Sequence, residues 1–491
     1  MPLVPAPPGF DVGFDDTPAP RFAPPSAASL FVVGLADRGT VGQSRSLAEH
    51  RDRFGGRVNY SVAGDAVAVM FGERAGGTVT FSRVTGPGAV ASTITLNDAE
   101  VAPAPSLKVT APAPGASYDG PDGYTVEVTS ESTSVRVTIR DGAETVVASP
   151  LLDDHADLVA WAPTVREDLA IVEVVGDELP AVTVSPVDLA GGDDDRTNIT
   201  TDEWAAAAEL LDPRFGPGLV LAPGVSTAAI HRVLVDHAAA TGRLARLDLD
   251  PDVTEQQAGA AAAALLADRP ATAWRGALWA SWAYAAPVPG EPERLVPYSA
   301  IDAGVHSRIL GETGIGSPTF GPAFASSLTA TRLYREWTTT TDPAGEVQRL
   351  YAGRVNVAID RGSTIAPEGY RTLDPDERRE DLATATTRMA LEWRGGQIAL
   401  SMIGSGVTWN TIASYNGRLA DVIVAEFSRA LNPTGPDGVE DGGYRVSTDR
   451  PVNAPESMAQ RHMHARTRIR PAGSTHWVDL LVGTSTATEQ L

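Results

Sequence analysis

The spacing of hydrophobic positions along the chain first indicates an alternation of strands and helices. The run FVVGL at 31–35 is apolar throughout, as in a buried strand. The segments SLAEHRDRF at 46–54 and AVAVMFGERAG at 66–76 predict helices, and TVTFSRV at 78–84 predicts a second strand. This order of elements is typical of the beginning of an α/β fold.

The same alternation returns from about residue 200 and predicts a parallel sheet. A helix is expected in TDEWAAAAELL with Thr201 as its N-cap, and another in STAAIHRVLVDHAAATG, capped by Ser226 and ended by Gly242. The other expected elements are strands in GLVLAPG, LARLDLD and RGALWASWAYA and a helix in TEQQAGAAAAALLAD. Residues 286–345 show no clear period, and we expect an irregular stretch there.

A different pattern fills residues 91–195, where short alternating runs are separated by Gly, Pro and Asp. The expected strands are TITL, SLKVTA, YTVEVTS, SVRVTIRD, ETVVAS and AVTVSPV, and DHADLVAWA is expected to be a helix. The run GGDDDR at 191–196 is expected to be the linker that leaves this region, with its aspartates facing solvent. Together these features predict a β-rich domain inserted into an α/β sequence.

Helical and strand patterns recur toward the C-terminus. REDLATATTRMALEW predicts one helix, and the strongest helix of the chain is expected at 408–431. The apolar stripe of that helix consists of Ile412, Tyr415, Leu419, Ile423 and Phe427. We expect strands in YRVSTDR, HMHARTRIR and HWVDLLVG.

The first 28 residues are rich in proline and lack a regular period, so we expect an extended arm or tail. Phe10, Val12, Phe14 and Phe22 could bind this arm to a partner. The sequence therefore predicts a multidomain α/β protein of mixed α+β character. Its expected parts are an N-terminal arm (1–28), an α/β domain (29–90 and 196–375), an inserted β-rich domain (91–195), a C-terminal α+β domain (376–480) and a C-terminal arm (481–491).

Composition narrows the classes of function. The 491 residues carry a formal charge of −23, which argues against nucleic acid or an anionic membrane as a partner. The absence of cysteine excludes disulfides, thiolate catalysis and cysteine-based metal sites. No signal peptide or membrane-spanning run is visible, so we expect assembly in a cytoplasm. Lys108 is the only lysine, and no glycine loop precedes it, which argues against a phosphate-binding loop.

Glycine-rich segments offer three candidate sites for chemistry. The opening turn, GLADRGTVG at 34–42, lacks the spacing of a nucleotide-binding loop, so a tight structural turn is the favoured interpretation. The segment Gly311 to Gly321 neither follows a clear strand nor opens a helix, which indicates a loop. Gly404, Ser405 and Gly406 lack the outer residues of a nucleophile elbow.

Histidine, aspartate and tryptophan residues form further candidate clusters. His462 and His464 share one face of an expected strand, and His476 could join them at a metal, but no carboxylate motif accompanies them. His231 and His237 are expected not to converge on their helix. Asp193, Asp194 and Asp195 could ligate a cation, although solvated linker residues are the favoured interpretation. Trp274, Trp279 and Trp282 could stack on a sugar, although packing against a sheet is favoured. None of these groups predicts a catalytic, cofactor or metal site, and an assembly role becomes the leading hypothesis.

The order of several segments resembles the contractile tail sheath family of bacteriophages and related injection machines. The opening strand is followed by Gly34, Ala36, Arg38, Gly39 and Gly42 and by a helix ending in FGG, as in the family. SLKVTAPAPGASYDG, GALWASWAYAAPVPG with VPYSAIDAGVHSRI, and YRVSTDRPVNAP after the long helix match further family segments in order. The chain departs from the family after Gly115, and 91–195 is only loosely covered.

The resemblance implies a structural subunit without catalytic residues or cofactors. Such subunits form a helical sleeve around an inner tail tube, expected to be built of six-fold rings, and associate with baseplate and tail-terminator proteins. Contraction of the sleeve drives the tube through the host envelope for genome delivery, which implies a place in the virion tail. Terminal arms, here with Phe10 to Phe22 and with Leu481 and Val482, would add strands to neighbours, and the C-terminal domain, with Arg418 and Arg429, would face the tube. The alternatives are the sheath of an injection particle or bacteriocin, and a carbohydrate-binding or hydrolytic enzyme.

Overall fold

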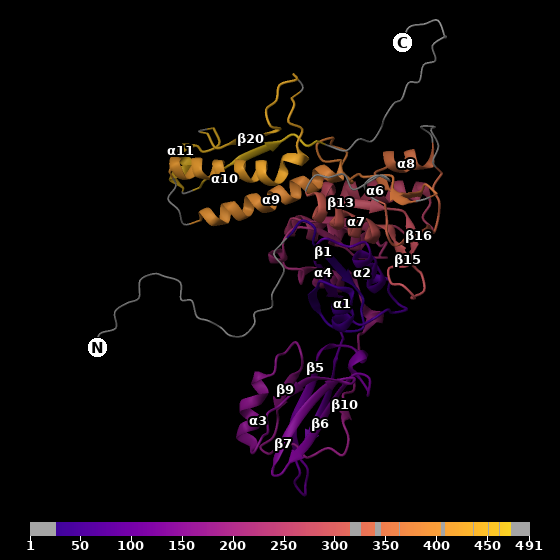
Figure 1. Ribbon diagram of the computed structural model, residues 1–491, viewed down its shortest axis with the longest axis vertical. Coiled ribbons are helices and arrows are strands. Elements are labelled where there is room, and N and C mark those ends of the chain that lie inside the picture. Colours follow the sequence, from indigo (N-terminus) through magenta and orange to yellow (C-terminus); the bar gives the residue numbers. More distant parts are fainter. Residues whose placement is uncertain are drawn as a thin grey trace, which may run out of the picture.

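The structure is a computed structural model that describes residues 26–472, apart from gaps at 315–325, 339–344, 363, 404–407, 436, 450 and 461. It combines helices and sheets throughout, as the α/β prediction requires. A layered core lies between a strand-rich part that projects from one end and a pair of long helices that extends to one side (Figure 1).

The core is built on a seven-stranded sheet of order β17-β13-β12-β11-β1-β3-β2. Its strands are β1 (Leu30–Gly34), β2 (Val41–Ser44), β3 (Val79–Arg83), β11 (Leu219–Leu221), β12 (Leu244–Asp248), β13 (Gly276–Trp279) and β17 (Val355–Asn356). All neighbours are parallel except β2, which pairs antiparallel with β3 at the sheet edge. The sequence pattern missed β2 because this strand is short and only Ser44 in it is buried.

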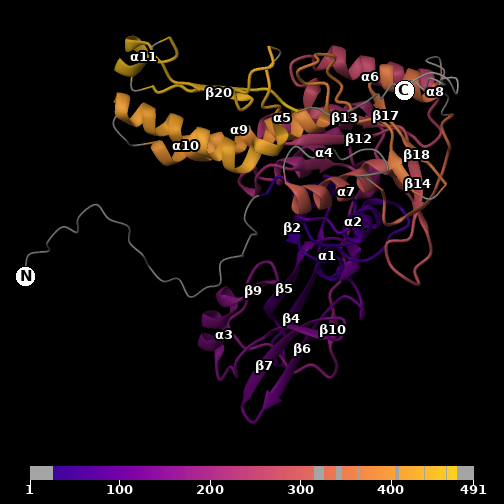
Figure 2. The ribbon, with the colours of Figure 1, turned by 45° about the horizontal axis from the view of Figure 1, so that its top comes forward.

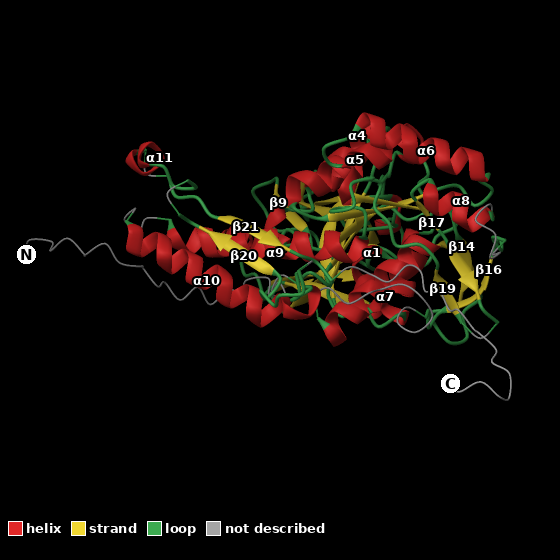
Figure 3. Ribbon diagram, turned by 90° about the horizontal axis from the view of Figure 1, so that it is seen from above, coloured by secondary structure: helices red, strands yellow, loops and turns green. Residues whose placement is uncertain are grey.

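Helices cover both faces of this sheet (Figure 3). One face packs against α4 (Thr201–Glu209), α5 (Ala228–Thr241), α6 (Glu255–Asp268) and α8 (Glu346–Ala352), and the other against α2 (Ala63–Gly72), α7 (Tyr298–Thr313) and the start of α9 (Leu382–Met402). Strand residues alternate between the two cores: Phe31 and Val33 face the first group of helices, and Leu30 and Val32 face the second. The short helix α1 (Leu47–Phe54) closes the sheet edge near β2.

Three details of the core differ from the sequence prediction. Helix α7 lies in the stretch 286–345, for which we expected no regular structure. The sequence pattern does not indicate this helix because it is buried almost all round and therefore shows no amphipathic period. The expected strand RGALWASWAYA is two strands, since β13 joins the large sheet and β14 (Trp282–Ala285) pairs with β15 (Arg294–Pro297) and β16 (Ala330–Leu333). A further pair consists of β18 (Ala358–Asp360) and β19 (Ile365–Pro367).

Both predicted N-caps are wrong by one residue. Helix α4 is capped by Thr200, whose hydroxyl and backbone form a capping box with Glu203. Helix α5 is preceded by Thr227, which makes no side-chain cap bond. The predicted stop at Gly242 is confirmed by its φ of 73°, a left-handed conformation in which glycine is favoured.

Residues 91–188 form two separate antiparallel sheets that project from the core (Figure 1). Their strands are β4 (Ala91–Asn97), β5 (Pro105–Pro114) and β9 (Ile171–Val174) in one sheet and β10 (Val187–Asp188), β6 (Tyr124–Glu131), β7 (Ser134–Asp141) and β8 (Glu144–Ala148) in the other. Helix α3 (His155–Trp161) covers them, and Leu107, Val126, Ile139 and Trp161 belong to their shared core. The prediction of a strand in AVTVSPV is wrong except at Val187, and β9 was not predicted.

The C-terminal part is a helical hairpin carrying a small sheet (Figure 2). Helix α9 is followed by α10 (Trp409–Phe427), the strands β20 (Tyr444–Ser447) and β21 (Arg466–Ile469), and the short helix α11 (Pro455–Ala459). The predicted stripe of α10 is confirmed, because all five of its residues are buried. The expected strand in HWVDLLVG lies outside the described residues.

Candidate functional site: a buried joint at the opening turn

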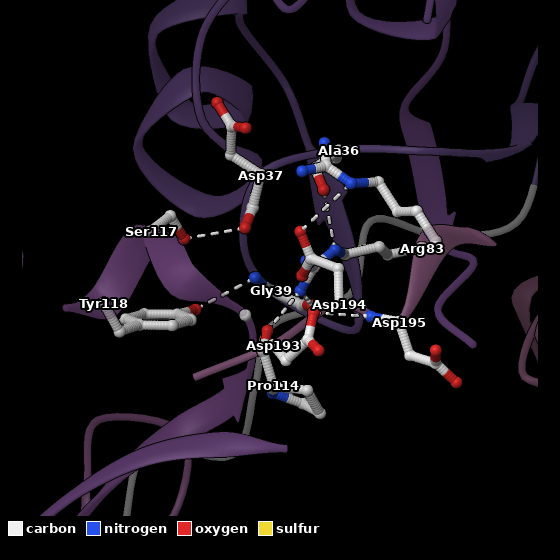
Figure 4. Close-up of polar contacts among 12 residues, drawn as sticks. Ala36, Asp37, Gly39, Arg83, Pro114, Ser117, Tyr118, Asp193, Asp194 and Asp195 are labelled. Carbon is white, nitrogen blue, oxygen red and sulfur yellow. Dashed lines mark hydrogen bonds and ion pairs between the residues drawn. The ribbon is translucent and has the colours of Figure 1, made fainter. Parts of the chain in front are cut away.

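The opening turn between β1 and β2 is a structural corner that contacts the projecting strands (Figure 4). Gly39 has a φ of 75°, and a Cβ added there would lie 2.6 Å from the carbonyl oxygen of Arg53, so the position requires glycine. The Gly39 amide donates to the Tyr118 hydroxyl at 2.9 Å, and the Ser117 hydroxyl donates to the Asp37 carbonyl at 2.7 Å. The turn is thus occupied by the chain's own residues rather than arranged around a phosphate.

Arg83, at the end of β3, contacts three segments that meet at the opening turn. We call this cluster the Arg83 joint. The Arg83 guanidinium donates to the carbonyl oxygens of Ala36 at 2.8 Å and Pro114 at 2.6 Å, and it forms an ion pair with Asp194. The Arg83 side chain is 1% exposed. The opening turn, the end of β5 and the returning linker are therefore fixed to one buried cation.

The prediction that the linker aspartates face solvent is wrong for Asp194, which is buried at the joint. Burial raises the pKa of its carboxyl group, and Arg83 and Arg196 act in the opposite direction. Asp195 adopts a left-handed backbone and accepts a hydrogen bond from Gly88 at 2.8 Å. These contacts pair the segment that leaves the core with the segment that returns to it.

Two further contacts lie beside the Arg83 joint. Arg38 forms an ion pair of 2.6 Å with Asp141 of β7, which joins the opening turn to the four-stranded sheet. The Tyr60 hydroxyl donates to Asp37 at 2.7 Å, while the Arg196 guanidinium lies 3.7 Å from the centre of the Tyr60 ring. The arrangement can hold the projecting sheets in one orientation, and it does not assemble a nucleophile with a base.

The tryptophan cluster is part of the core. Trp274, Trp279 and Trp282 are all buried, and the Trp282 indole donates to the Leu249 carbonyl at 2.8 Å. The sugar-stacking hypothesis is therefore wrong, because the rings offer no open face. The competing interpretation, packing against the sheet, is confirmed.

The histidines on α5 do not converge. His231 is buried against the Asp248 carbonyl at 2.9 Å, and His237 contacts the Arg243 guanidinium at 2.9 Å. Burial lowers the pKa of both imidazoles, and for His237 the neighbouring Arg243 lowers it further, to about 4. Both side chains are structural and neutral near pH 7.

The other candidates give no metal or catalytic centre among the residues described. His462 and His464 precede β21, with ring centres 6.3 Å apart, and no three ligating side chains gather anywhere in the described chain. Lys108 is exposed and pairs with Glu173 at 3.0 Å. His476, Gly404 to Gly406 and most of the Gly311 to Gly321 loop lie outside the described residues. Within the described part, no helix has the length and apolarity needed to cross a bilayer.

The residues expected to act in assembly fall into two groups: two arginines that the structure describes, and six apolar residues that it does not. Arg418 and Arg429 are exposed on and just beyond α10, and Arg418 donates to the Ser401 hydroxyl at 3.3 Å. Glu426, on the same helix, pairs with Arg394. Phe10, Val12, Phe14, Phe22, Leu481 and Val482 lie outside the described residues.

A groove of about 820 Å³ lies beside the small C-terminal sheet. Its lining residues include Glu377, Arg378, Arg388, Glu392, Tyr415, Leu419, Thr467 and Ile469. Among the described strands, β20 and β21 pair only with each other, so this sheet keeps edges to which a further strand could add. Neither the groove nor the Arg83 joint was found from the sequence, because both bring together residues far apart along the chain.

Comparisons with known proteins identify the fold. No protein-family model and no curated protein matches the chain. A sheath tail protein of Listeria innocua is similar with a TM-score of 0.59 at 11% identity, covering 86% of this chain and 89% of its own. The contracted sheath of the anti-feeding prophage gives 0.53 at 13% identity, with 98% and 100% covered. The contracted sheath complex of an extracellular contractile injection system, PVC, gives 0.52 at 12% identity, with 99% of each chain covered. As the sequence resemblance predicted, the chain has the fold of contractile sheath proteins.

Proposed function

We propose that this chain is the structural subunit of a contractile tail sheath. The observation that carries the proposal is the extent of the match: sheath chains cover 98% and 99% of this chain within one fold. On this proposal, subunits polymerise as a helical sleeve around an inner tail tube, and contraction drives the tube through the host envelope for genome delivery. No catalytic step or cofactor is part of the proposal.

On this proposal, the first partner of each subunit is another copy of the same chain. Further copies of the chain would form six-fold helical rings, linked by arms at residues 1–28 and 481–491. The edges of the β20–β21 sheet would accept such arms, since main-chain hydrogen bonds can survive a rotation of neighbouring subunits. At roughly 1 kcal/mol net per bond, a five-residue strand contributes a few kcal/mol to each link.

The remaining surfaces follow from the same assignment. Residues 376–480 would face the inner tube, with Arg418 and Arg429 in contact with it, and the inserted sheets of 91–195 would lie outside the sleeve. Baseplate and tail-terminator proteins would bind the ends of the sleeve. The assembled particle would be the tail of a virion built in the cytoplasm of a bacterial host.

A second candidate is the sheath of an injection particle rather than of a virion. It is favoured by the similar chains of the anti-feeding prophage and of the PVC contractile injection system, which match this chain over its full length. Capsid and terminase genes beside the coding gene would indicate a virion, whereas their absence beside intact tail genes would indicate an injection particle.

Electron microscopy of the purified chain tests the proposal. Helical tubes or stacked rings, formed alone or on added tube protein, are the expected result. Monodisperse monomers under both conditions would contradict it and would favour a carbohydrate-binding or hydrolytic protein, which glycan binding and hydrolase assays would then address.

A further inference from the structure

Helix α9 changes its surroundings abruptly within one turn. Every residue from Leu382 to Ala390 is buried except Arg388, which is half-buried, so this half belongs to the core. None of the residues from Leu391 to Met402 is buried, and this half runs beside α10 instead (Figures 1 and 2). One continuous helix therefore connects two different environments.

Two adjacent glycines, Gly395 and Gly396, lie just beyond this change. Glycine is the poorest helix former after proline, and pairs of small residues are places where helices bend. Packing does not require them: a Cβ at Gly395 would make an ordinary contact of 3.7 Å with Leu419, and one at Gly396 would meet nothing within 4 Å. By contrast, a Cβ at Gly304 of α7 would lie 2.8 Å from Glu73, so that glycine permits close helix packing.

A third glycine lies at the same level of the neighbouring helix. Gly417 of α10 stands between Tyr415, whose hydroxyl donates to the Gly395 carbonyl at 3.4 Å, and Leu419, which a Cβ at Gly395 would contact. A Cβ at Gly417 would also meet nothing within 4 Å. Both helices of the hairpin thus contain glycine without a packing reason at one cross-section.

The hairpin is anchored on the core side of this cross-section. Arg394 pairs with Glu426, the Arg275 guanidinium pairs with Glu392 at 2.6 Å, and Ile423 packs in the same cluster as Ala390. These contacts connect the base of the hairpin to the core sheet.

The far side of the hairpin has separate contacts of its own. The Asn416 amide donates to the Thr448 hydroxyl at 3.0 Å, and Asn453 bonds the backbone of both Thr448 and His464. These bonds join the start of α10 to Thr448, Asn453 and His464, which can therefore move with it.

We propose that Gly395, Gly396 and Gly417 form a hinge across the α9–α10 hairpin. The far half, which carries the start of α10 together with Thr448, Asn453 and His464, swings on this hinge relative to the core. The motion belongs to the single subunit and goes beyond the proposed sheath role. In a sheath, it would allow the far half of the hairpin to keep its contacts while the core rotates.

Distance measurements on the full chain test the hinge. The chain lacks cysteine, so paired cysteines can be introduced and spin-labelled without interference. The pair A206C/S414C spans the hinge from exposed sites on α4 and α10, and A206C/D421C, also exposed, stays on the core side. Each pair is measured in the unaltered background, in G395A/G396A/G417A, and in G259A, whose added Cβ in α6 also meets nothing within 4 Å.

The hinge predicts a broad distance distribution for A206C/S414C that narrows in G395A/G396A/G417A but not in G259A. A206C/D421C should give a narrow distribution in every background. An A206C/S414C distribution that is equally wide in the triple variant would overturn the proposal, as would equal narrowing in G259A. Because these readouts need no polymer, their failure is distinguishable from a failure of the sheath assignment.

Discussion

At the scale of single residues, buried arginines fix the loops of this protein. Arg243 donates to the carbonyls of Gly216, Leu211 and Asp212 and stacks on Phe31 at 3.6 Å. Arg83 acts in the same way at the joint, where it donates to the carbonyls of Ala36, Gly39 and Pro114 and pairs with Asp194. A planar guanidinium can bond several loops at once, which the compact ammonium group of lysine does less well.

Replacing Arg83 by methionine should therefore destabilise the protein strongly. R83M leaves the buried Asp194 carboxylate with only the partly exposed Arg196, whose Nε lies 3.7 Å away. Losing one member of a buried pair costs about 3–5 kcal/mol. The matched control is R38M, whose pair with Asp141 is partly exposed and contributes under about 1 kcal/mol. Urea titration of both variants measures the difference, and equal losses would show that Arg83 is not central to the joint.

His50 should make stability fall in acid. The imidazole is buried against Phe54 and Phe81, and burial, with a smaller effect of Arg51, lowers its pKa to about 4. Since the unfolded imidazole gains its proton near pH 6.5, stability is lost as pH falls from 6.5 toward 4, by about 3 kcal/mol for this group. The variant H50L should flatten the dependence in unfolding titrations between these pH values, and an unchanged slope would contradict the assignment.

At the scale of elements, the periodicity of hydrophobic residues predicted the helices and strands that are amphipathic and missed those that are not. The stripe of α10 from Ile412 to Phe427 was correct because one face is buried and the other is exposed. Helix α7 was missed because it is buried almost all round, and β2 because it is short and mostly exposed. The Arg83 joint depends on a contact between residues 83 and 194, which no local pattern contains.

The N-terminal arm should be needed for assembly but not for folding. Deleting residues 2–20 removes Phe10 and Phe14 but keeps the whole of the core sheet, whose first strand, β1, begins at Leu30. We expect a soluble, folded subunit by circular dichroism and no tubes by electron microscopy. Normal tubes from this deletion would show that the arm does not link subunits.

Contact with the inner tube should depend on the charge of the C-terminal hairpin. The double reversal R418E/R429E leaves the fold intact, because both side chains are exposed. It should weaken co-sedimentation with the tube, because it removes surface ion pairs that each contribute under about 1 kcal/mol. The difference in the bound fraction between the variant and the unaltered chain should shrink as the salt concentration rises, since salt screens exposed charges. The reversal D421R, at a third exposed site on the helix, is the comparison. Unchanged binding across the salt series would exclude this surface.

At the scale of the whole molecule, the projecting sheets carry a distinct charge. Acidic residues are frequent in 91–195, where the basic residues are only Lys108, Arg136, Arg140 and Arg166. This part is therefore the main source of the net charge of −23. Strong like charge suits a surface that stays solvated, which supports the proposed place of this part outside the sleeve.

A cut in the projecting sheets should leave assembled tubes intact. The linker at 191–195 is unsuitable for this test, because Asp194 is held at the joint, but Val101 is fully exposed in the loop between β4 and β5. In V101K, a lysine-specific protease should cut at 101, whereas Lys108 lies within β5. Cleaved tubes of normal appearance are expected. Resistance of position 101 in tubes, with cutting in free subunits, would indicate that the loop is covered.

The joint also makes the projecting sheets a replaceable module. The departing and returning segments run side by side, with the Val90 amide donating to the Asp193 carbonyl at 2.8 Å and the Gly86 amide donating to the Asp194 carbonyl at 2.9 Å. Any unit whose two ends lie close together can be joined to such a pair without stretching the core, which is where domain insertions succeed. A foreign domain grafted between Val90 and Asp193 would be displayed once per subunit, and in a sleeve it would repeat along the whole particle.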